Sequence, residues 1–337
     1  MLPWQGLEHR MRTVFSATLI LGITIACSAT ADDAADAHGS SESSAETSNE
    51  TSNDTETSTS EDTTDDGDAE CESDPLDPAA LEWEPLPSIA DSPEDHAGMS
   101  MLFVDADNEI YVAAALASAP DWSSPWRVEV HHYLGTEWEL VGAGPAYTGE
   151  AVATPIGLAK DDQGTVFVAF GSAGQVRLRE STGSGWQDAD PVSPDADDSL
   201  VTITSDRSGR VLALTADDRQ AQVHRRTGDG WQQLGDTLAP TGMASPGDLL
   251  LGQLAVNCAN HVAASFRNTV FLWRGESWEN LGQFAPADQQ VFFPRLALAP
   301  DARPIVSWRT STMEGDVLFT ARWNPGGPWV AHSATES

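Results

Sequence analysis

Basic side chains are scarce in this sequence of 337 residues. It contains 17 Lys and Arg against 52 Asp and Glu, which gives a formal net charge of −35, and Lys160 is its single lysine. Nucleic acids and anionic lipid surfaces attract proteins through clustered positive charge. The charge balance therefore disfavours both as partners.

Motifs of catalytic and metal sites are also missing. The sequence has no H-E-x-x-H, no Cys/His zinc spacing and no glycine-rich phosphate loop. Gly183-Ser184-Gly185 is a turn that lacks the pattern of a nucleophile elbow. These absences favour a protein that is not an enzyme, although one fold can host many chemistries and the question stays open.

A helical period of apolar residues is absent as well, and a longer repeat takes its place. The motif Gly-x-x-Trp occurs five times, at intervals of 48, 45, 47 and 51 residues between tryptophans. A period near 47 residues is typical of repeat architectures. The five tryptophans are Trp138, Trp186, Trp231, Trp278 and Trp329.

Each repeat reads as four short antiparallel strands. In residues 156–186 an apolar run, an Asp-x-x-Gly turn and a second apolar run predict a tight hairpin. Val176–Arg179 then alternates apolar and charged residues, which indicates a strand with one wet face, and Trp186 opens a fourth strand. We therefore predict an all-β fold, a β-propeller of about five four-stranded blades.

The same pattern can be followed through all five units. The first hairpins are predicted to turn at Asp105, Asp161, Asp206, Asn257 and Asp301. The predicted inner strands are 100–104, 156–159, 200–203, 253–256 and 295–298, and they should line the central channel. Residues 81–87 look like a fourth strand without its blade.

These units resemble kelch-type propeller blades over residues 81–333. The hairpin, the third strand and the Trp that opens the fourth strand carry the resemblance. Residues 162–167 also resemble part of a sialidase-type Asp box. The resemblance implies a propeller architecture, and it implies no specific family.

The first 27 residues look like an export signal. Basic residues precede a run of 13 apolar or small residues, which is too short to span a bilayer, since a span needs about 20 residues. Residues 24–27 resemble a bacterial lipobox that ends at Cys27, the predicted lipidation site, whereas Ala29-Thr30-Ala31 offers an ordinary cleavage site. The predicted location is the outer membrane or cell surface through a lipid anchor; the alternative is a soluble secreted or periplasmic protein.

Residues 28–77 are predicted to be a disordered acidic tether. From Asp32 to Asp77 there are 17 acidic residues and no Lys or Arg. Such a segment cannot bury enough apolar surface to offset its ordering entropy. It would hold the propeller domain, residues 78–337, away from the membrane, to which the lipid would be the only attachment.

Two cysteines remain if Cys27 carries the lipid. Cys71 and Cys258 would then lie in an oxidising compartment. A disulfide between them is a hypothesis, because sequence cannot show that the two positions meet.

The repeated tryptophans are predicted to be packing residues, because an indole fills the volume where blades diverge. Trp122 and Trp126 are different, since they fall in a predicted insertion between the second and third strands of the first unit. Loops carry function on propellers, so these two residues are candidate ligand anchors.

A calcium site is an alternative for one acidic turn. Asp105, Asp107 and Glu109 offer oxygen ligands at alternate positions, as calcium loops do. The turn lacks the central glycine of an EF-hand, and Asp and Asn are favoured in turns anyway. No other cofactor is indicated.

Three functional hypotheses follow. The first is a monomeric binding, recognition or scaffold module for a protein or glycan ligand. The second is a sialidase-like or other glycosidase, which would need paired carboxylates at the channel mouth. The third is a structural envelope lipoprotein without a small ligand.

Overall fold

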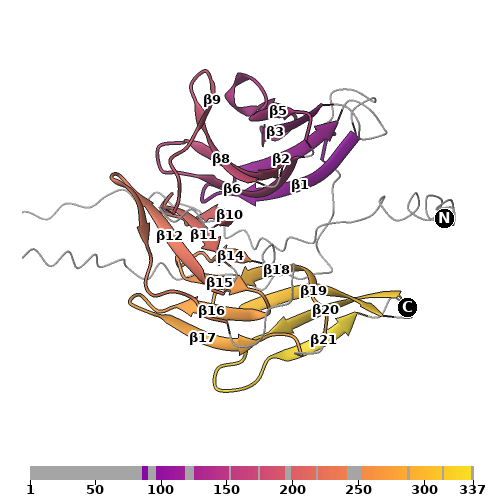
Figure 1. Ribbon diagram of the computed structural model, residues 1–337, viewed down its shortest axis with the longest axis vertical. Coiled ribbons are helices and arrows are strands. Elements are labelled where there is room, and N and C mark those ends of the chain that lie inside the picture. The colour runs from indigo at the N-terminus through magenta and orange to yellow at the C-terminus, as the bar shows by residue number, and fades with distance from the viewer. Residues whose placement is uncertain are drawn as a thin grey trace, which may run out of the picture.

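The structure, a computed structural model, is an all-β five-bladed propeller (Figure 1). It describes residues 86–334 except 90–95, 118–124, 152, 174, 194–198, 218, 241–251, 287–288 and 313–314. The predicted fold class is confirmed. Cys27, Cys71, Trp122 and the predicted signal and tether lie outside the described residues.

Each blade is a sheet built from consecutive strands. Within every sheet the four strands pair in chain order and antiparallel. Blade 1 contains β1 (His96–Val104), β2 (Ile110–Ala117), β3 (Trp126–Tyr133) and β4 (Trp138–Leu140), with a short β5 (Tyr147–Gly149) on β3. Blade 2 contains β6 (Ala153–Lys160), β7 (Val166–Ser172), β8 (Gln175–Thr182) and β9 (Gly185–Asp188).

The remaining blades repeat this order. Blade 3 contains β10 (Ser199–Ser205), β11 (Val211–Ala216), β12 (Ala221–Thr227) and β13 (Gly230–Gln233). Blade 4 contains β14 (Gln253–Val256), β15 (Val262–Phe266), β16 (Thr269–Trp273) and β17 (Trp278–Gln283). Blade 5 contains β18 (Phe292–Leu298), β19 (Pro304–Thr312), β20 (Gly315–Arg322) and β21 (Val330–Ala334). A single 3₁₀ turn, Val141–Ala143, interrupts the strands of the described chain.

The repeated hairpin has a common physical basis. Oδ1 of Asp161 accepts hydrogen bonds from the backbone N–H groups of Gln163 and Thr165, and equivalent bonds occur at Asp105, Asp206 and Asn257. In blade 5 the turn begins at Ala299, whose backbone pairs with Arg303. Asp301, the predicted turn residue, lies two positions further on.

Apolar clusters join each blade to the next. Tyr111 and Val130 of blade 1, for example, pack with Val168 and Phe170 of blade 2. The inner strands run close together: a Cβ added to Gly157 would lie 2.6 Å from the backbone N of Ile203 in blade 3. Only a residue without a side chain fits that approach.

Three of the repeated tryptophans hydrogen-bond to the backbone of the preceding blade region. The indole of Trp186 donates to the backbone oxygens of Val141 and Gly144. Trp278 donates to Leu234 O, and Trp329 donates to Leu281 O. In three interfaces, therefore, an indole N–H satisfies a carbonyl just beyond the preceding repeat tryptophan.

The five blades follow an arc whose ends are blades 1 and 5 (Figure 1). Extensive packing joins β1 to β6, β6 to β10, β10 to β14 and β14 to β18. Among the described residues no comparable packing joins the strands of blade 5 to those of blade 1. The end blades therefore each carry one sheet face that no neighbouring blade covers in this part of the chain.

Candidate functional site

Trp126 is not a loop residue. It is the first residue of β3, it is 1% exposed, and it belongs to a buried cluster with Ala115 and Ala117. The prediction that Trp126 lies in an insertion is therefore wrong, and its indole is covered by the protein. Its role as a ligand anchor stays a prediction.

The predicted calcium ligands are engaged in other contacts. Asp105 Oδ1 accepts the N–H groups of Asp107 and Glu109, and Asp105 Oδ2 lies 2.7 Å from Lys160 Nζ. Within the described ranges, no three His, Cys, Asp or Glu side chains gather so that they could hold a metal ion. A calcium ion here would have to displace Lys160.

Lys160 instead joins blades 1 and 2. Its Nζ also lies 2.5 Å from Glu109 Oε2, which accepts a hydrogen bond from Tyr111. The bond to Lys160 lowers the pKa of Glu109, and burial together with the Glu109 contact raises the pKa of Tyr111 to about 12. The ring of His132 stacks on Tyr111 at a centroid distance of 4.5 Å. This cluster is an ionic link between blades.

A second polar cluster lies on the opposite face of blade 1. Glu129 Oε1 lies 2.6 Å from Arg127 Nε, and Glu129 Oε2 lies 3.1 Å from His131 Nε2. Glu129 and His131 are 9% and 4% exposed. The bonds from His131 and Arg127 outweigh burial and lower the pKa of Glu129. Consecutive His131 and His132 thus serve opposite faces, as strand geometry predicts.

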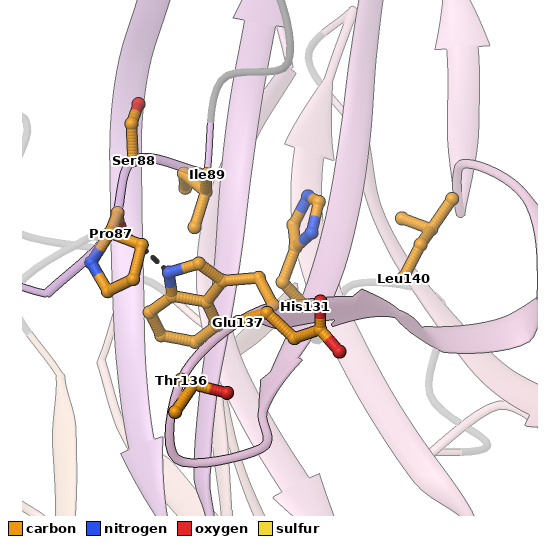
Figure 2. Close-up of a pocket in the computed structure, with 8 residues that line it drawn as sticks. Pro87, Ser88, Ile89, His131, Thr136, Glu137 and Leu140 are labelled. Atoms are coloured by element: carbon orange, nitrogen blue, oxygen red, sulfur yellow. Dashed lines mark hydrogen bonds between the residues drawn. The ribbon is translucent and has the colours of Figure 1, made fainter.

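His131 lines a pocket of about 260 Å³. Figure 2 shows its walls: the segment Pro87–Ile89 on one side and the β3–β4 turn on the other. The indole of Trp138 donates a 2.9 Å hydrogen bond to Pro87 O (Figure 2). Thr136, Glu137 and Leu140 complete the lining.

The pocket has a structural cause. In blades 4 and 5 the repeat tryptophan donates to a carbonyl in, or just after, the outer strand of a complete preceding blade. In blade 1 the described residues that occupy that place form an irregular segment around Pro87. A single segment covers less surface than a four-stranded sheet, so a pocket lined by His131 and the β3–β4 turn remains beside it.

Two further residues lie away from both clusters. His224 on β12 is 4% exposed, and its Nε2 lies 3.0 Å from Thr215 Oγ1. Cys258 is disulfide-bonded. Its pairing with Cys71 stays a prediction, because the partner lies outside the described residues.

No family model matches the chain, and no curated protein matches it. Among solved structures, the intramolecular trans-sialidase from Ruminococcus gnavus in complex with oseltamivir carboxylate is 10% identical, over 72% of this chain and 85% of that chain, with a TM-score of 0.43. YCF48 bound to D1 peptide is 12% identical, over 72% and 85%, with a TM-score of 0.37.

A third solved structure, an alpha-L-arabinanase from Penicillium chrysogenum complexed with arabinobiose, is 10% identical, over 67% of this chain and 76% of that chain, with a TM-score of 0.42. Values this low carry no argument about ligand or reaction, so the fold assignment rests on the strand pairing. Among the residues that the structure describes, no helix is long and apolar enough to cross a membrane.

Proposed function

We propose that this chain is an exported, lipid-anchored recognition module whose propeller binds a glycan through the pocket on blade 1. The observation that carries the proposal is the composition of that pocket. It combines the indole of Trp138 with the imidazole of His131, the hydroxyl of Thr136 and the carboxylate of Glu137. An aromatic face beside several hydrogen-bonding groups suits a ring that carries hydroxyls.

The size of the pocket limits the ligand. Ligand pockets usually enclose about 300–1,000 Å³, so 260 Å³ suits one sugar residue rather than a long chain. The salt bridge and hydrogen bond that hold Glu129 keep His131 in one orientation. A fixed imidazole loses little freedom on binding, which favours selectivity for one arrangement of hydroxyls.

Four carboxylates of the described residues are unsuited to the role of acid catalyst in glycoside hydrolysis. A glycosidase needs a carboxylic acid with a raised pKa to protonate the leaving group. Glu109, Glu129, Glu180 and Asp301 all have lowered pKa values, because each is bound by basic or amide side chains. They are therefore carboxylates held in the charged form.

A glycan array probed with the mature full chain tests the proposal, with a fluorogenic glycoside panel beside it. The variant T136V/E137Q alters the exposed β3–β4 turn and should weaken binding of any glycan hit at least tenfold. The matched control E276Q/S277A changes the corresponding turn before Trp278 in blade 4 and should leave affinity within twofold. If T136V/E137Q binds the glycan as tightly as the control variant does, the pocket is not the binding site. Turnover of a glycoside would show that the protein is an enzyme rather than a binding module.

The anchor belongs to the same proposal. Residues 1–27, the lipobox-like end and the acidic segment 28–77 support an outer-membrane or cell-surface location with the propeller held away from the bilayer. Substitution C27S should move the protein from the membrane fraction to the soluble fraction, and the mature wild-type chain should carry lipid mass at its first residue. A mature chain that begins at Asp32 without lipid would show that the ordinary cleavage site is used.

A further inference from the structure

Blade 5 presents one sheet face that the described part of the chain leaves uncovered. Blade 4 packs against Leu298, Val306 and Ala321. The alternate positions of the same strands point the other way, and they include Leu318, which is 49% exposed, and Val330, which is 40% exposed. Among the described residues, therefore, no neighbouring blade covers this outer face.

Arg295 lies on this outer face without a carboxylate partner among the described residues. Its register partner is Ser307, whose side chain alternates with Val306 and Trp308 on β19. The Arg295 side chain is half-buried, and its Nη1 donates a long hydrogen bond of 3.4 Å to Pro294 O. Burial lowers the pKa of Arg295, and no neighbouring charge offsets that effect. A guanidinium in this situation has donors available for an anion.

Arg309 adds a second guanidinium on the same face. It pairs in register with Phe292, two positions from Ser307 on β19. Nη1 of Arg309 lies 3.1 Å from Asp316 Oδ2, whereas its Nε is buried and has no hydrogen-bond partner in the described structure. The guanidinium carbon of Arg309 lies 5.1 Å from the ring centre of Phe293, within the range of a cation–π contact.

Phe293 is strained and exposed at once. The register of β18 shifts between Phe292 and Arg295, and Phe293 has a φ of 50°. A bulky side chain in the left-handed region carries a conformational cost. Its ring is 56% exposed, so burial on this chain does not offset the cost. Strained residues of this kind cluster at ligand sites, and here the bulge aims an aromatic ring outward next to two arginines.

We propose that Phe293, Arg295 and Arg309 bind a carboxylate-bearing sugar, a uronic acid residue of an acidic glycan. The two guanidinium groups would donate to the carboxylate, since planar forked donors match its two oxygens. The exposed ring of Phe293 would stack on the C–H face of the sugar. Ser307 and Thr320, which pair across β19 and β20 on this face, would donate to ring hydroxyls.

Charge complementarity favours this occupant. Residues 292–334 contain four arginines and three acidic residues, in a chain whose net charge is −35. At 0.15 M salt, charges beyond about 8 Å are largely screened, so the local arginines decide the attraction. An acidic peptide would satisfy the arginines but would give Phe293 no ring to stack on. This site is separate from the pocket on blade 1 and stands without it.

Calorimetric titration of the mature full chain with trigalacturonate at 0.15 M salt tests the proposal. Binding should be at least tenfold tighter than that of neutral galactotriose. R295Q and R309Q should each weaken it at least tenfold, and F293A should weaken it severalfold. The matched control R274Q removes an exposed, ion-paired arginine of blade 4 and should leave the affinity within twofold.

Several results would overturn the proposal. Equal affinity for the neutral and the acidic trisaccharide would show that the arginines do not bind the carboxylate. Equal affinity for triglutamate and trigalacturonate would show that the sugar ring, and its stacking on Phe293, does not contribute to binding. If the wild-type chain does not bind trigalacturonate at 10 mM, the proposed uronic acid site is refuted. Circular dichroism of each variant shows that lost binding is not lost folding.

Discussion

The link between Lys160 and the turn of blade 1 can be tested by Lys160→Met. The substitution keeps the apolar stem and removes the ammonium that lies 2.7 Å from Asp105 Oδ2 and 2.5 Å from Glu109 Oε2. Removing one partner of a buried ion pair costs about 3–5 kcal/mol. The side chain of Asp105 is 6% exposed, whereas that of Glu109 is 40% exposed. Water can therefore solvate Glu109 after the substitution, which reduces the free-energy cost of losing that contact. We expect a loss of about 2 kcal/mol.

Scanning calorimetry at pH 7 is the assay. A loss of about 2 kcal/mol corresponds to a fall of roughly 4–8 °C in Tm for a domain of this size. The double variant D105N/K160M should recover part of the loss, because an Asn side chain can still accept the turn hydrogen bonds, as Asn257 does in blade 4. The control R274M breaks an exposed pair and should change stability by less than about 0.5 kcal/mol. A Tm for K160M within 1 °C of the wild type would refute the reasoning.

The same variant has a defined pH dependence. Lys160 lowers the pKa of Glu109, so the stability gained from that carboxylate is present above its unfolded pKa, about 4.3, and is lost as pH falls through the folded value. The pKa of Lys160 is raised, so its own contribution is complete below about 10.4 and is lost only at higher pH. The difference in Tm between wild type and K160M should stay constant from pH 6 to 9 and shrink below pH 4.

Three further variants test the packing. Trp278→Phe removes the indole donor to Leu234 O and should cost about 1–2 kcal/mol in urea unfolding; an unchanged midpoint would contradict the role of the indole. Gly157→Ala places a Cβ 2.6 Å from the backbone of Ile203 and should lower Tm by several degrees or prevent folding, whereas a wild-type Tm would show that the strands can part. Arg295→Met removes a half-buried charge without an acidic partner and should raise stability by about 1 kcal/mol in the same assay, while a loss would reveal a partner for the guanidinium.

Much of the fold could be predicted from sequence because its signals are local. Each strand is short and alternates or is wholly apolar, each first hairpin has an Asp- or Asn-type turn, and the tryptophan marks the same point in every repeat. The exceptions have physical reasons. Ala299 begins its turn without a capping side chain, and the apparent marker Asp301 lies inside the turn. Trp126 follows a run of turn residues, yet it pairs with Ala117 in the sheet.

The candidate sites had weaker signals. The pocket depends on the contact between Pro87 and Trp138, which are 51 residues apart. No local sequence pattern predicts this contact. Phe293 owes its exposure to a shift in the register of β18, and sequence does not specify a bulge. His224 sits in an alternating strand that suggested a wet face, but blade 2 covers that face, as the 2.8 Å bond between Arg226 and Glu180 shows.

The pairing of strands in strict chain order has a consequence for how the molecule is made. Every sheet is complete as soon as its fourth strand has been synthesised, because no blade borrows a strand from a distant part of the described chain. Contacts close in sequence form quickly, so each blade can assemble on its predecessor before the following blades have formed. Deletion or duplication of a whole unit would then leave the pairing inside all other blades intact. Such a chain can change its length by one repeat without having to find a new fold.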